Sequence, residues 1–353
     1  MQKFYRLFFL ACLAWVKGAL ALELHLFNWT GYLGEKTKAK FEERCRCRIV
    51  EDTYASNDEL LAKLASGVKG YDLIVPTGHA VEILIHEQKL LPLDKKKLPH
   101  LSNIEPAFLH PPYDPENRYS VPYATTTTIL GYRKEKIQEL GLAANSWTLI
   151  FDPRLLEKIK GKVMVLDEAR EVLGAALMSL GHPANDTDPE HLKEAQALIQ
   201  KAKPFWAAFS NQSYMREIVS GGIWVAMGYS SDFFQAARNA RAVAGPEIAY
   251  GIPKEGAVLA VDNLAIPVGA REPELAHAFI DFVLEGEAGQ ELAESLGMGI
   301  PNKETKAKLS QEILANEAIF PPSEALLRLH QLRAHPLKTR RLIDRIWSEI
   351  KAY

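Results

Sequence analysis

The chain has 353 residues, of which 47% are hydrophobic and 24% charged, a composition typical of a globular protein long enough for two domains. Its 42 Lys and Arg residues nearly balance 44 Asp and Glu residues, which gives a formal net charge of -2. This balance argues against a basic nucleic-acid-binding surface and against a disordered acidic tail.

The N-terminus is typical of a secretory signal peptide. Lys3 and Arg6 precede an almost wholly apolar stretch from Leu7 to Val16, and Ala19-Leu20-Ala21 follows as an A-x-A cleavage pattern. The apolar stretch is too short for a transmembrane span. Cys12 stands in a sequence similar to a lipobox, so a lipid on Cys12 is an alternative to cleavage after Ala21. In both cases we expect the mature protein to work outside the cytoplasm.

Apolar strands alternate with amphipathic helices along most of the chain. The first part predicts strands at 24–27, 48–52 and 71–76 and helices at 34–44, 56–67 and 81–88. The middle predicts strands at 163–166 and 222–227 and helices at 188–203 and 231–241. The last part predicts a strand at 263–268 and helices at 272–284, 287–295 and 337–352. Ser56-Asn57-Asp58-Glu59 is expected to form a capping box, Ser231 to cap the helix at 231–241, and Gly297 to close that at 287–295.

This β-α-β-α order predicts a sheet with helices on both faces. The two α/β halves have neither an internal repeat nor a flexible linker between them. We therefore expect the chain to cross between two lobes more than once. Such crossings can form a hinge, with a ligand cleft between the lobes.

Motifs of the common enzyme classes are missing from the sequence. Gly228-Tyr229-Ser230-Ser231-Asp232 does not match G-x-S-x-G, and His86-Glu87 lacks the second histidine of a zinc protease. No Walker A or G-x-G-x-x-G motif opens a helix. His79 and Glu82 form a helical i, i+3 pair with no further metal ligand nearby. We expect no catalysis and no cofactor, although a missing motif does not by itself exclude an enzyme.

Cys45 and Cys47 are the only cysteines after the expected signal peptide. Three arginines flank them in Arg44-Cys45-Arg46-Cys47-Arg48, and no further ligand is near, which argues against a metal site. We interpret them as two structural thiols entering a strand, with a bond between them as the alternative.

Three segments carry a recognisable pattern: Asn28-Trp29-Thr30-Gly31-Tyr32, Asp167-Glu168-Ala169-Arg170-Glu171 and Asp262-Asn263-Leu264-Ala265-Ile266-Pro267. With the segments 54–57, 71–76, 119–123, 253–256 and 299–302, and with Gln331, they resemble the periplasmic spermidine- and putrescine-binding proteins of ABC transporters. The resemblance covers nearly the whole mature chain. Each motif alone is weak, but the set in this order is specific.

The resemblance implies an α/β fold of the periplasmic-binding-protein type, with two interleaved lobes, a hinge and a ligand cleft between the lobes. After the signal peptide at 1–21, the first lobe would comprise 22–127 and 261–307, and the second 128–260 and 308–353. The protein would capture its ligand as a monomer, close, and deliver the ligand to an ABC permease and, indirectly, to its ATPase.

The resemblance also implies a polyamine site. Because a buried ammonium group needs a carboxylate partner, and aromatic faces suit both cations and methylenes, such a site combines acids with aromatic rings. The implied ligand-binding residues are Trp29, Tyr32, Thr77, His79, Glu168, Glu171, Tyr229, Asp262 and Gln331. Trp29 and Tyr32 would form a wall in the first lobe, Glu168 and Glu171 would hold one amine, and Asp262 another.

Ala260 and Met298 replace aromatic residues of the family, and Glu168 replaces its commoner aspartate. With Glu168 reaching farther into the cleft and fewer aromatic faces available, putrescine would be slightly favoured over spermidine. Singly, the acids at 167–171 could serve a helix N-terminus and Asp262 a turn. The alternatives for the whole chain are a receptor for another small solute, such as an amino acid derivative or Fe(III), a surface lipoprotein without a transport role, and a secreted hydrolase.

Overall fold

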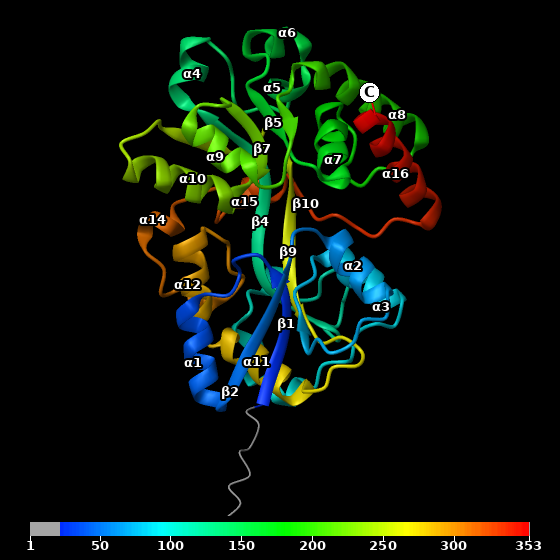
Figure 1. Cartoon of the computed structure of the whole chain (residues 1–353), viewed down its shortest axis with the longest axis vertical. Coiled ribbons are helices and arrows are strands. Elements are labelled where there is room, and N and C mark those ends of the chain that lie inside the picture. Colours follow the sequence, from blue (N-terminus) through cyan, green and yellow to red (C-terminus); the bar gives the residue numbers. More distant parts are fainter. Residues whose placement is uncertain (1–21, 353) are drawn as a thin grey trace, which may run out of the picture.

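The computed structural model describes residues 22–352, so the expected signal peptide with Cys12 and Ala21 lies outside the described residues. Two lobes lie one above the other, and two long strands, β4 (Ser120–Arg133) and β9 (Ala257–Ala265), run through the middle and join them (Figure 1). The two strands pair antiparallel, from Ser120 opposite Ala265 to Thr127 opposite Leu259. No helix in the described part of the chain has the length and apolarity needed to cross a membrane.

The first lobe is built on β1 (Leu22–Trp29), which pairs in parallel with β2 (Cys47–Tyr54) and β3 (Leu73–Ile74). Its helices are α1 (Glu35–Cys45), α2 (Asn57–Ala65), α3 (Gly78–His86), α11 (Pro273–Leu284) and α12 (Glu287–Leu296). Side chains alternate across β1, so Leu24 and Leu26 pack toward α1, α11 and α12, whereas Phe27 packs toward α2 and α3. The expected layout, with helices on both faces of a sheet, is therefore present.

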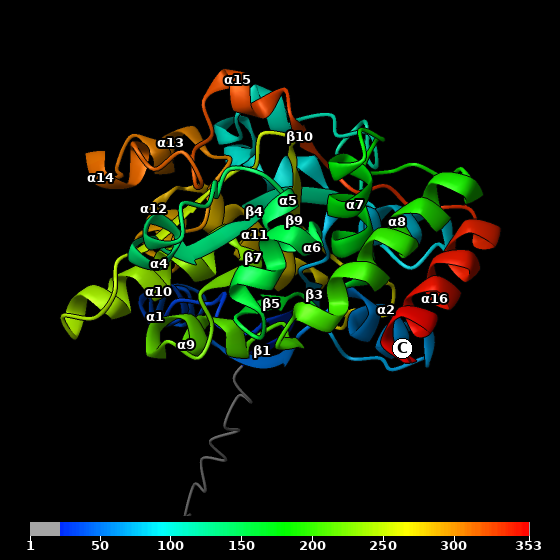
Figure 2. The same cartoon turned by 90° about the horizontal axis from the view of Figure 1, so that it is seen from above.

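The second lobe continues the sheet in the order β4-β7-β5-β6. Its strands are β5 (Val163–Val165), β6 (Ala208–Phe209), β7 (Val225–Tyr229) and β8 (Ile248–Gly251). Its helices are α4 (Lys134–Glu139), α5 (Thr148–Phe151), α6 (Pro153–Leu156), α7 (Ala169–Ser179), α8 (Pro189–Ala202), α9 (Ser213–Ser220), α10 (Ser230–Ala242) and α16 (Leu337–Ala352). Figure 2 shows the C-terminal helix α16 beside α8 at the edge of this lobe.

The segment between α12 and α16 contains α13 (Lys303–Lys306), α14 (Gln311–Leu314), α15 (Ser323–Leu326) and β10 (Leu329–His330).

Each lobe has a hydrophobic core of its own, around Phe41 and Phe279 in the first and around Trp147 and Phe233 in the second. Leu309, Ile313 and Ile319 pack in the core of the first lobe, although the predicted division gave residues from 308 onward to the second. The other predicted boundaries stay a prediction.

Several local expectations need correction. The strand predicted at 263–268 extends instead over Ala257–Ala265. It was missed in part because β9 lies buried between neighbouring strands and its polar residues are buried too, so no alternation of polar and apolar residues marks its start. Helix α10 begins at Ser230 after Tyr229, and Ser231 lies inside the helix rather than capping it. Cys45 and Cys47, interpreted as free thiols, form a disulfide across the turn between α1 and β2.

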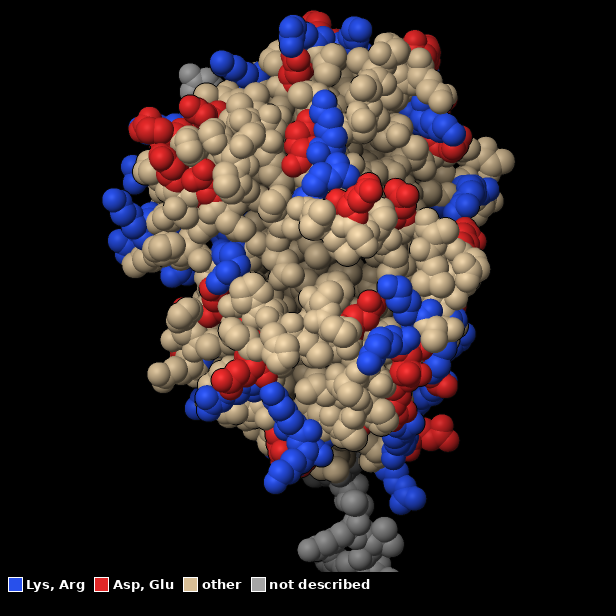
Figure 3. Space-filling model, turned by 180° about the vertical axis from the view of Figure 1, so that it is seen from behind, with Lys and Arg blue, Asp and Glu red and all other residues tan. Residues whose placement is uncertain are grey.

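The charged residues on the face seen from behind are of both signs and are interspersed, and the middle of that face is mostly uncharged (Figure 3). This agrees with the balanced composition and shows no basic patch of the kind that binds nucleic acid on that face.

Candidate ligand-binding site

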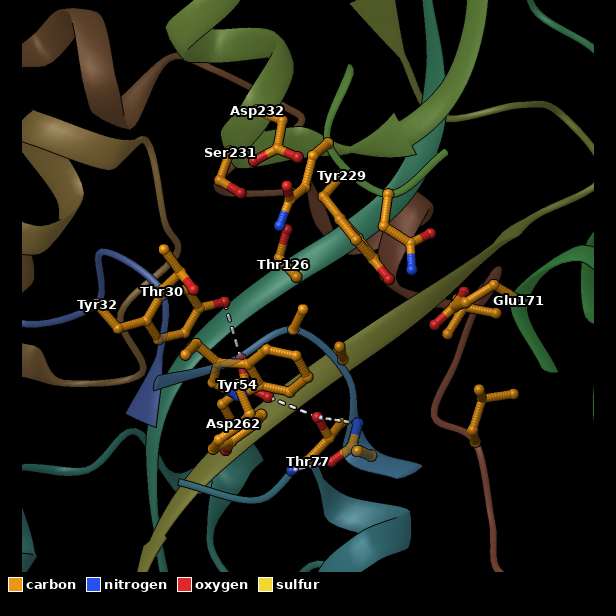
Figure 4. A pocket seen from close by; sticks show the side chains of 18 of the residues that line it. Thr30, Tyr32, Tyr54, Thr77, Thr126, Glu171, Tyr229, Ser231, Asp232 and Asp262 are labelled. Carbon is orange, nitrogen blue, oxygen red and sulfur yellow. Dashed lines mark hydrogen bonds between the residues drawn. The ribbon is translucent and has the colours of Figure 1, made fainter. Parts of the chain in front are cut away.

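A cavity of about 400 Å³ lies between the lobes, beside the crossing strands β4 and β9 (Figure 4). This is the size of a site for a small molecule. The predicted residues that line it are Trp29, Tyr32, Thr77, His79, Glu171, Tyr229 and Asp262. Both lobes contribute to it, so the cavity is the interlobe cleft that the crossings predicted.

Asp262 is the central acid on the first-lobe side. It is 2% exposed, and its carboxylate accepts hydrogen bonds from Thr77 Oγ1 at 2.7 Å and from the Tyr32 hydroxyl at 3.1 Å. Burial raises the pKa of Asp262 to about 6, although these two hydrogen bonds oppose the shift. Asn57 Nδ2 in turn donates to Thr77 Oγ1 at 3.0 Å, which fixes the hydroxyl so that it donates to the acid.

The backbone explains why Asp262 faces the cavity. Val258, Ala260 and Asp262 line it as alternate residues of one face of β9, and Leu259 between them also borders it. Opposite Asp262, the pairing of β4 shifts between Pro122 and Ala124, which is a β-bulge. Bulges are common beside binding sites, because the extra residue bends the strand and re-aims side chains.

Aromatic rings form the wall beside Asp262. The Trp29 and Tyr54 ring centroids lie 4.6 Å apart, and those of Trp29 and Tyr32 lie 6.2 Å apart. Trp29 Nε1 and the Tyr54 hydroxyl both donate to the Val75 carbonyl, at 2.9 and 2.5 Å. With their polar atoms bonded to the backbone, these two rings offer the cavity mainly apolar and π surface.

Two acids approach from the second lobe. Glu171, in the first turn of α7, accepts a hydrogen bond from the Thr128 hydroxyl at 2.8 Å, and burial raises its pKa to about 7 against the opposing effects of Thr128 and Arg170. Asp232, in the first turn of α10, accepts a hydrogen bond from the Tyr214 hydroxyl, and burial raises its pKa to about 6. In Figure 4, Asp232 lies near the top of the view, Asp262 below its middle and Glu171 at the right, so the three acids border the cavity at different places.

Asp232 was missed by sequence reasoning. The available signal was its position directly after the strand end Gly228-Tyr229, where a helix begins and residues commonly face a cleft. Other polar residues of the cavity that sequence reasoning missed are Thr30, Asn57, Thr126, Asn211, Gln212 and Ser231.

Glu168 and Gln331 are not among the residues that line this cavity. Glu168 lines an adjoining cavity of about 250 Å³, where Asn211 Nδ2 donates to its carboxylate at 3.1 Å. Burial, with repulsion from Glu171 and other nearby acids, raises the pKa of Glu168 to about 8. Its extra methylene therefore does not shorten the cleft between Glu171 and Asp262, contrary to expectation.

Gln331 contributes its backbone carbonyl to a hydrogen bond from Asn185 Nδ2 at 2.8 Å, while its side-chain Oε1 is buried without a partner among the described residues.

His79 lines both cavities. Burial, together with the charge of Arg170 and with His335, lowers the pKa of His79 to about 3, so the ring is neutral. Met298 is fully buried away from the cavity, whereas Ala260 lines it.

The charge of the cavity is one-sided. The residues that line it include three carboxyl groups, those of Glu171, Asp232 and Asp262, and, within the described chain, no Lys or Arg. Groups of three His, Cys, Asp or Glu side chains that could hold a metal ion occur at two other places in the described residues, not here. The arrangement therefore suits an organic cation with an apolar body.

Comparison with known proteins agrees with this geometry. A family model described as bacterial extracellular solute-binding protein matches residues 36–321. A putrescine/cadaverine-binding protein of Pseudomonas aeruginosa is 47% identical over 332 residues, with 94% of each chain covered. A putrescine-binding periplasmic protein of Escherichia coli is 32% identical over 346 residues, covering 95% of this chain and 94% of its own.

Among solved structures, the chain is similar to the spermidine/putrescine ABC transporter substrate-binding protein PotD of Streptococcus pneumoniae. The TM-score is 0.81 at 27% sequence identity, with 94% of this chain and 99% of that chain covered. The two-lobe fold is thus shared along nearly the whole length of both proteins.

Proposed function

Because this chain belongs to the family of bacterial extracellular solute-binding proteins, we propose that it is the polyamine receptor of an ABC importer, with putrescine favoured. Members of the family are receptors, so the chain is not an enzyme. The receptor works outside the cytoplasm, as a monomer, and hands its ligand to a permease whose ATPase drives import.

One observation carries the choice of ligand: three carboxyl groups, of which those of Glu171 and Asp262 are buried and that of Asp232 is partly buried, line the cavity with no Lys or Arg among its described lining residues. Burying a carboxylate without a charged partner is unfavourable, and each raised pKa is a consequence of that cost. An ammonium group that enters the cavity supplies the missing partner. A neutral or anionic solute would leave the acids unpaired.

The separation of the acids supports a ligand with two charged ends. Asp262 on the first-lobe side would hold one ammonium group, and Glu171 on the second-lobe side the other. The rings of Trp29 and Tyr32 would pack on the methylenes between them and attract the adjacent cations. Ala260, where the family has an aromatic residue, removes a surface that would stabilise a central ammonium, which favours the diamine over spermidine. The relatives named for putrescine and cadaverine support the same ligand class.

Calorimetry on the mature protein tests the proposal, with putrescine, cadaverine, spermidine, lysine and the neutral 1,4-butanediol as ligands. We expect saturable binding of the diamines at one site, weaker binding of spermidine, and none of the diol. Equal binding of the diol, or no binding of any amine, would refute it. Mass spectrometry of material released by gentle denaturation then identifies a copurified ligand, and a different solute there would favour the alternative receptor.

A further inference from the structure

A second group of ligand-type side chains lies on the second lobe, where the chain passes from α7 into α8. His182 follows α7, Asp186 lies in the connecting loop, and His191 stands in the first turn of α8. One nitrogen or oxygen from each of these three side chains lies within 4.8 Å of the others. The three residues line neither cavity and have no part in the polyamine site.

The two imidazole rings lie side by side. Their centroids are 3.8 Å apart at an interplanar angle of 17°. His191 Nδ1 lies 2.7 Å from an Asp186 carboxylate oxygen. His182 Nε2 lies 3.0 Å from a carboxylate oxygen of Glu194, a residue of α8 that follows His191 by about one helical turn. Two nitrogen donors and the Asp186 carboxylate therefore lie close together on the surface, and the Glu194 carboxylate lies beside His182.

The backbone holds this arrangement in place. Helix α7 ends at Ser179, Gly181 follows with a left-handed backbone (φ 86°), and the His182 N–H donates to the Leu177 carbonyl at 2.9 Å. The Asp186 N–H donates to the Pro183 carbonyl at 3.0 Å, and Asp188 caps α8 by accepting from the Glu190 N–H at 2.8 Å. Since each side chain projects from a fixed turn or helix end, the group is preorganised.

Two ordinary ion pairs are the simpler explanation, but they account poorly for the stacked rings. An exposed ion pair contributes little stability, about 0–1 kcal/mol. If both pairs were charged, two imidazolium rings would lie face to face at 3.8 Å, where they repel each other. A neutral imidazole carries one N–H and one nitrogen lone pair, so a neutral ring donates its N–H to the carboxylate and keeps the lone pair on its other nitrogen. A divalent cation binds neutral imidazoles through such lone pairs and pairs with the Asp186 carboxylate, so that no two imidazolium ions face each other.

We propose that His182, Asp186 and His191 bind a divalent transition-metal ion of the Zn²⁺ type. Glu194 lies beside His182 but outside this group of three, so its side chain would have to turn to supply a fourth ligand. Imidazole with carboxylate is the donor set of zinc and its neighbours, whereas Ca²⁺ and Mg²⁺ select oxygen ligands alone.

Metal binding requires a modest adjustment of the side chains. Ligand atoms about 2.0–2.1 Å from a tetrahedral ion lie roughly 3.3 Å from one another, so the widest separation here must shrink. The side chains of His182 and His191 are 22% and 36% exposed, which leaves both rings room to turn. The other group of this kind, His100 with Asp281 and Glu285, offers one histidine, and Arg44 already pairs with Glu285.

The inference does not rest on the proposed function. Helix α7 separates the two sites: Glu171 stands in its first turn and His182 follows its end, and its 11 residues span about 16 Å. Zinc binding and polyamine binding can therefore be measured separately, and the failure of one says nothing about the other.

Calorimetry of the untagged, metal-free mature protein with ZnSO₄, and separately with CaCl₂, tests the proposal. We expect one zinc site of micromolar affinity and no comparable calcium binding. His182→Ala and His191→Ala should each weaken zinc binding at least about tenfold, since each removes one ligand. His100→Ala, which alters the other histidine–carboxylate pair, is the matched control and should bind zinc like the wild type.

Circular dichroism and melting curves of each variant establish that the fold is kept, which these partly exposed positions favour. The proposal is wrong if the wild type binds no zinc at 100 µM. It is also wrong if the double variant His182→Ala/His191→Ala retains wild-type zinc affinity, or if calcium binds as tightly as zinc.

Discussion

Polyamine binding should weaken steeply as the pH falls from 7.5 to 5.5. Burial raises the pKa of Glu171 to about 7, and those of Asp262 and Asp232 to about 6, in the empty cavity. A carboxyl group pairs with an ammonium only when it is ionised, so below its pKa a proton must leave before the ligand binds. The amines of the ligand titrate near the pKa of lysine, about 10.4, and stay charged throughout.

The magnitude follows from these pKa values. At one pH unit below the pKa of a carboxyl group that must be ionised to bind, the affinity for the ligand is about tenfold lower, which corresponds to about 1.4 kcal/mol. Between pH 7.5 and 5.5, Glu171 then accounts for a loss of roughly 25-fold and Asp262 for roughly fourfold. If both pair with the diamine, the loss is about a hundredfold, and Asp232 adds up to about another fourfold.

The stability of the empty folded protein should depend on pH in the opposite direction to the ligand affinity. A carboxyl group whose pKa is raised by folding stabilises the folded protein below its unfolded pKa and loses this contribution as the pH rises through its folded pKa. These three acids therefore make the empty protein less stable at pH 7.5 than at pH 5.5. The increase in melting temperature caused by putrescine should in turn be larger at pH 7.5.

Calorimetry at pH 5.5, 6.5 and 7.5 checks the prediction, in buffers that differ in ionisation enthalpy. At pH 6.5 we expect about one proton to be released for each putrescine bound, which appears as a buffer-dependent heat. Glu171→Gln should show a shallower pH dependence than the wild type. An affinity that stays constant across the range, with no buffer-dependent heat, would mean that the carboxyl groups are already ionised or do not contact the ligand.

Three further predictions concern the cleft. Asp262→Asn should weaken putrescine binding by more than a hundredfold, because removing one partner of a buried ion pair costs about 3–5 kcal/mol. Calorimetry measures this loss of affinity, and full affinity in the variant would place Asp262 outside the site. Asp232→Asn should weaken binding at least about tenfold, with Asp58→Asn, in the adjoining cavity, as a control that should change it less. Putrescine should reduce the radius of gyration in small-angle scattering, and no change at saturation would contradict closure of the lobes.

Much of the fold could be predicted, because local patterns decide it. The C-terminal helix was predicted at 337–352 and extends over Leu337–Ala352, since its amphipathic period is unbroken. The start of β9 could not be predicted, because a strand buried within the sheet lacks the alternation of polar and apolar residues that marks an exposed one. The disulfide depends on the left-handed backbone of Arg46 (φ 53°), which brings Cys45 and Cys47 together and which spacing alone does not reveal.

The candidate site was predictable where motif and position coincide. Trp29, Tyr32 and Asp262 lie in recognisable segments and all line the cavity. Asp232 lies in no such segment, and its place depends on how β7 pairs with β4 and so positions the start of α10. Glu168 shows the converse: its motif is recognisable, but the direction of its side chain, toward the adjoining cavity, is a property of the folded loop.

The contacts between the lobes explain why closure should depend on the ligand. Arg333 pairs with Glu82 across the lobes at 3.0 Å, and Arg238 donates to the Glu294 carbonyl at the end of α12 at 2.7 Å. Arg333 is 42% exposed, and pairs of this kind contribute only about 0–1 kcal/mol each. An empty closed cleft meanwhile encloses three carboxyl groups, two of them buried and one partly buried, without a cation, and the loss of hydration raises the pKa of each one well above its usual range. These two polar contacts are therefore weak, and Phe234 of α10 adds an apolar contact with the first-lobe core. A dication that enters the cleft removes the cost of leaving the acids unpaired and so stabilises the closed form over the open one.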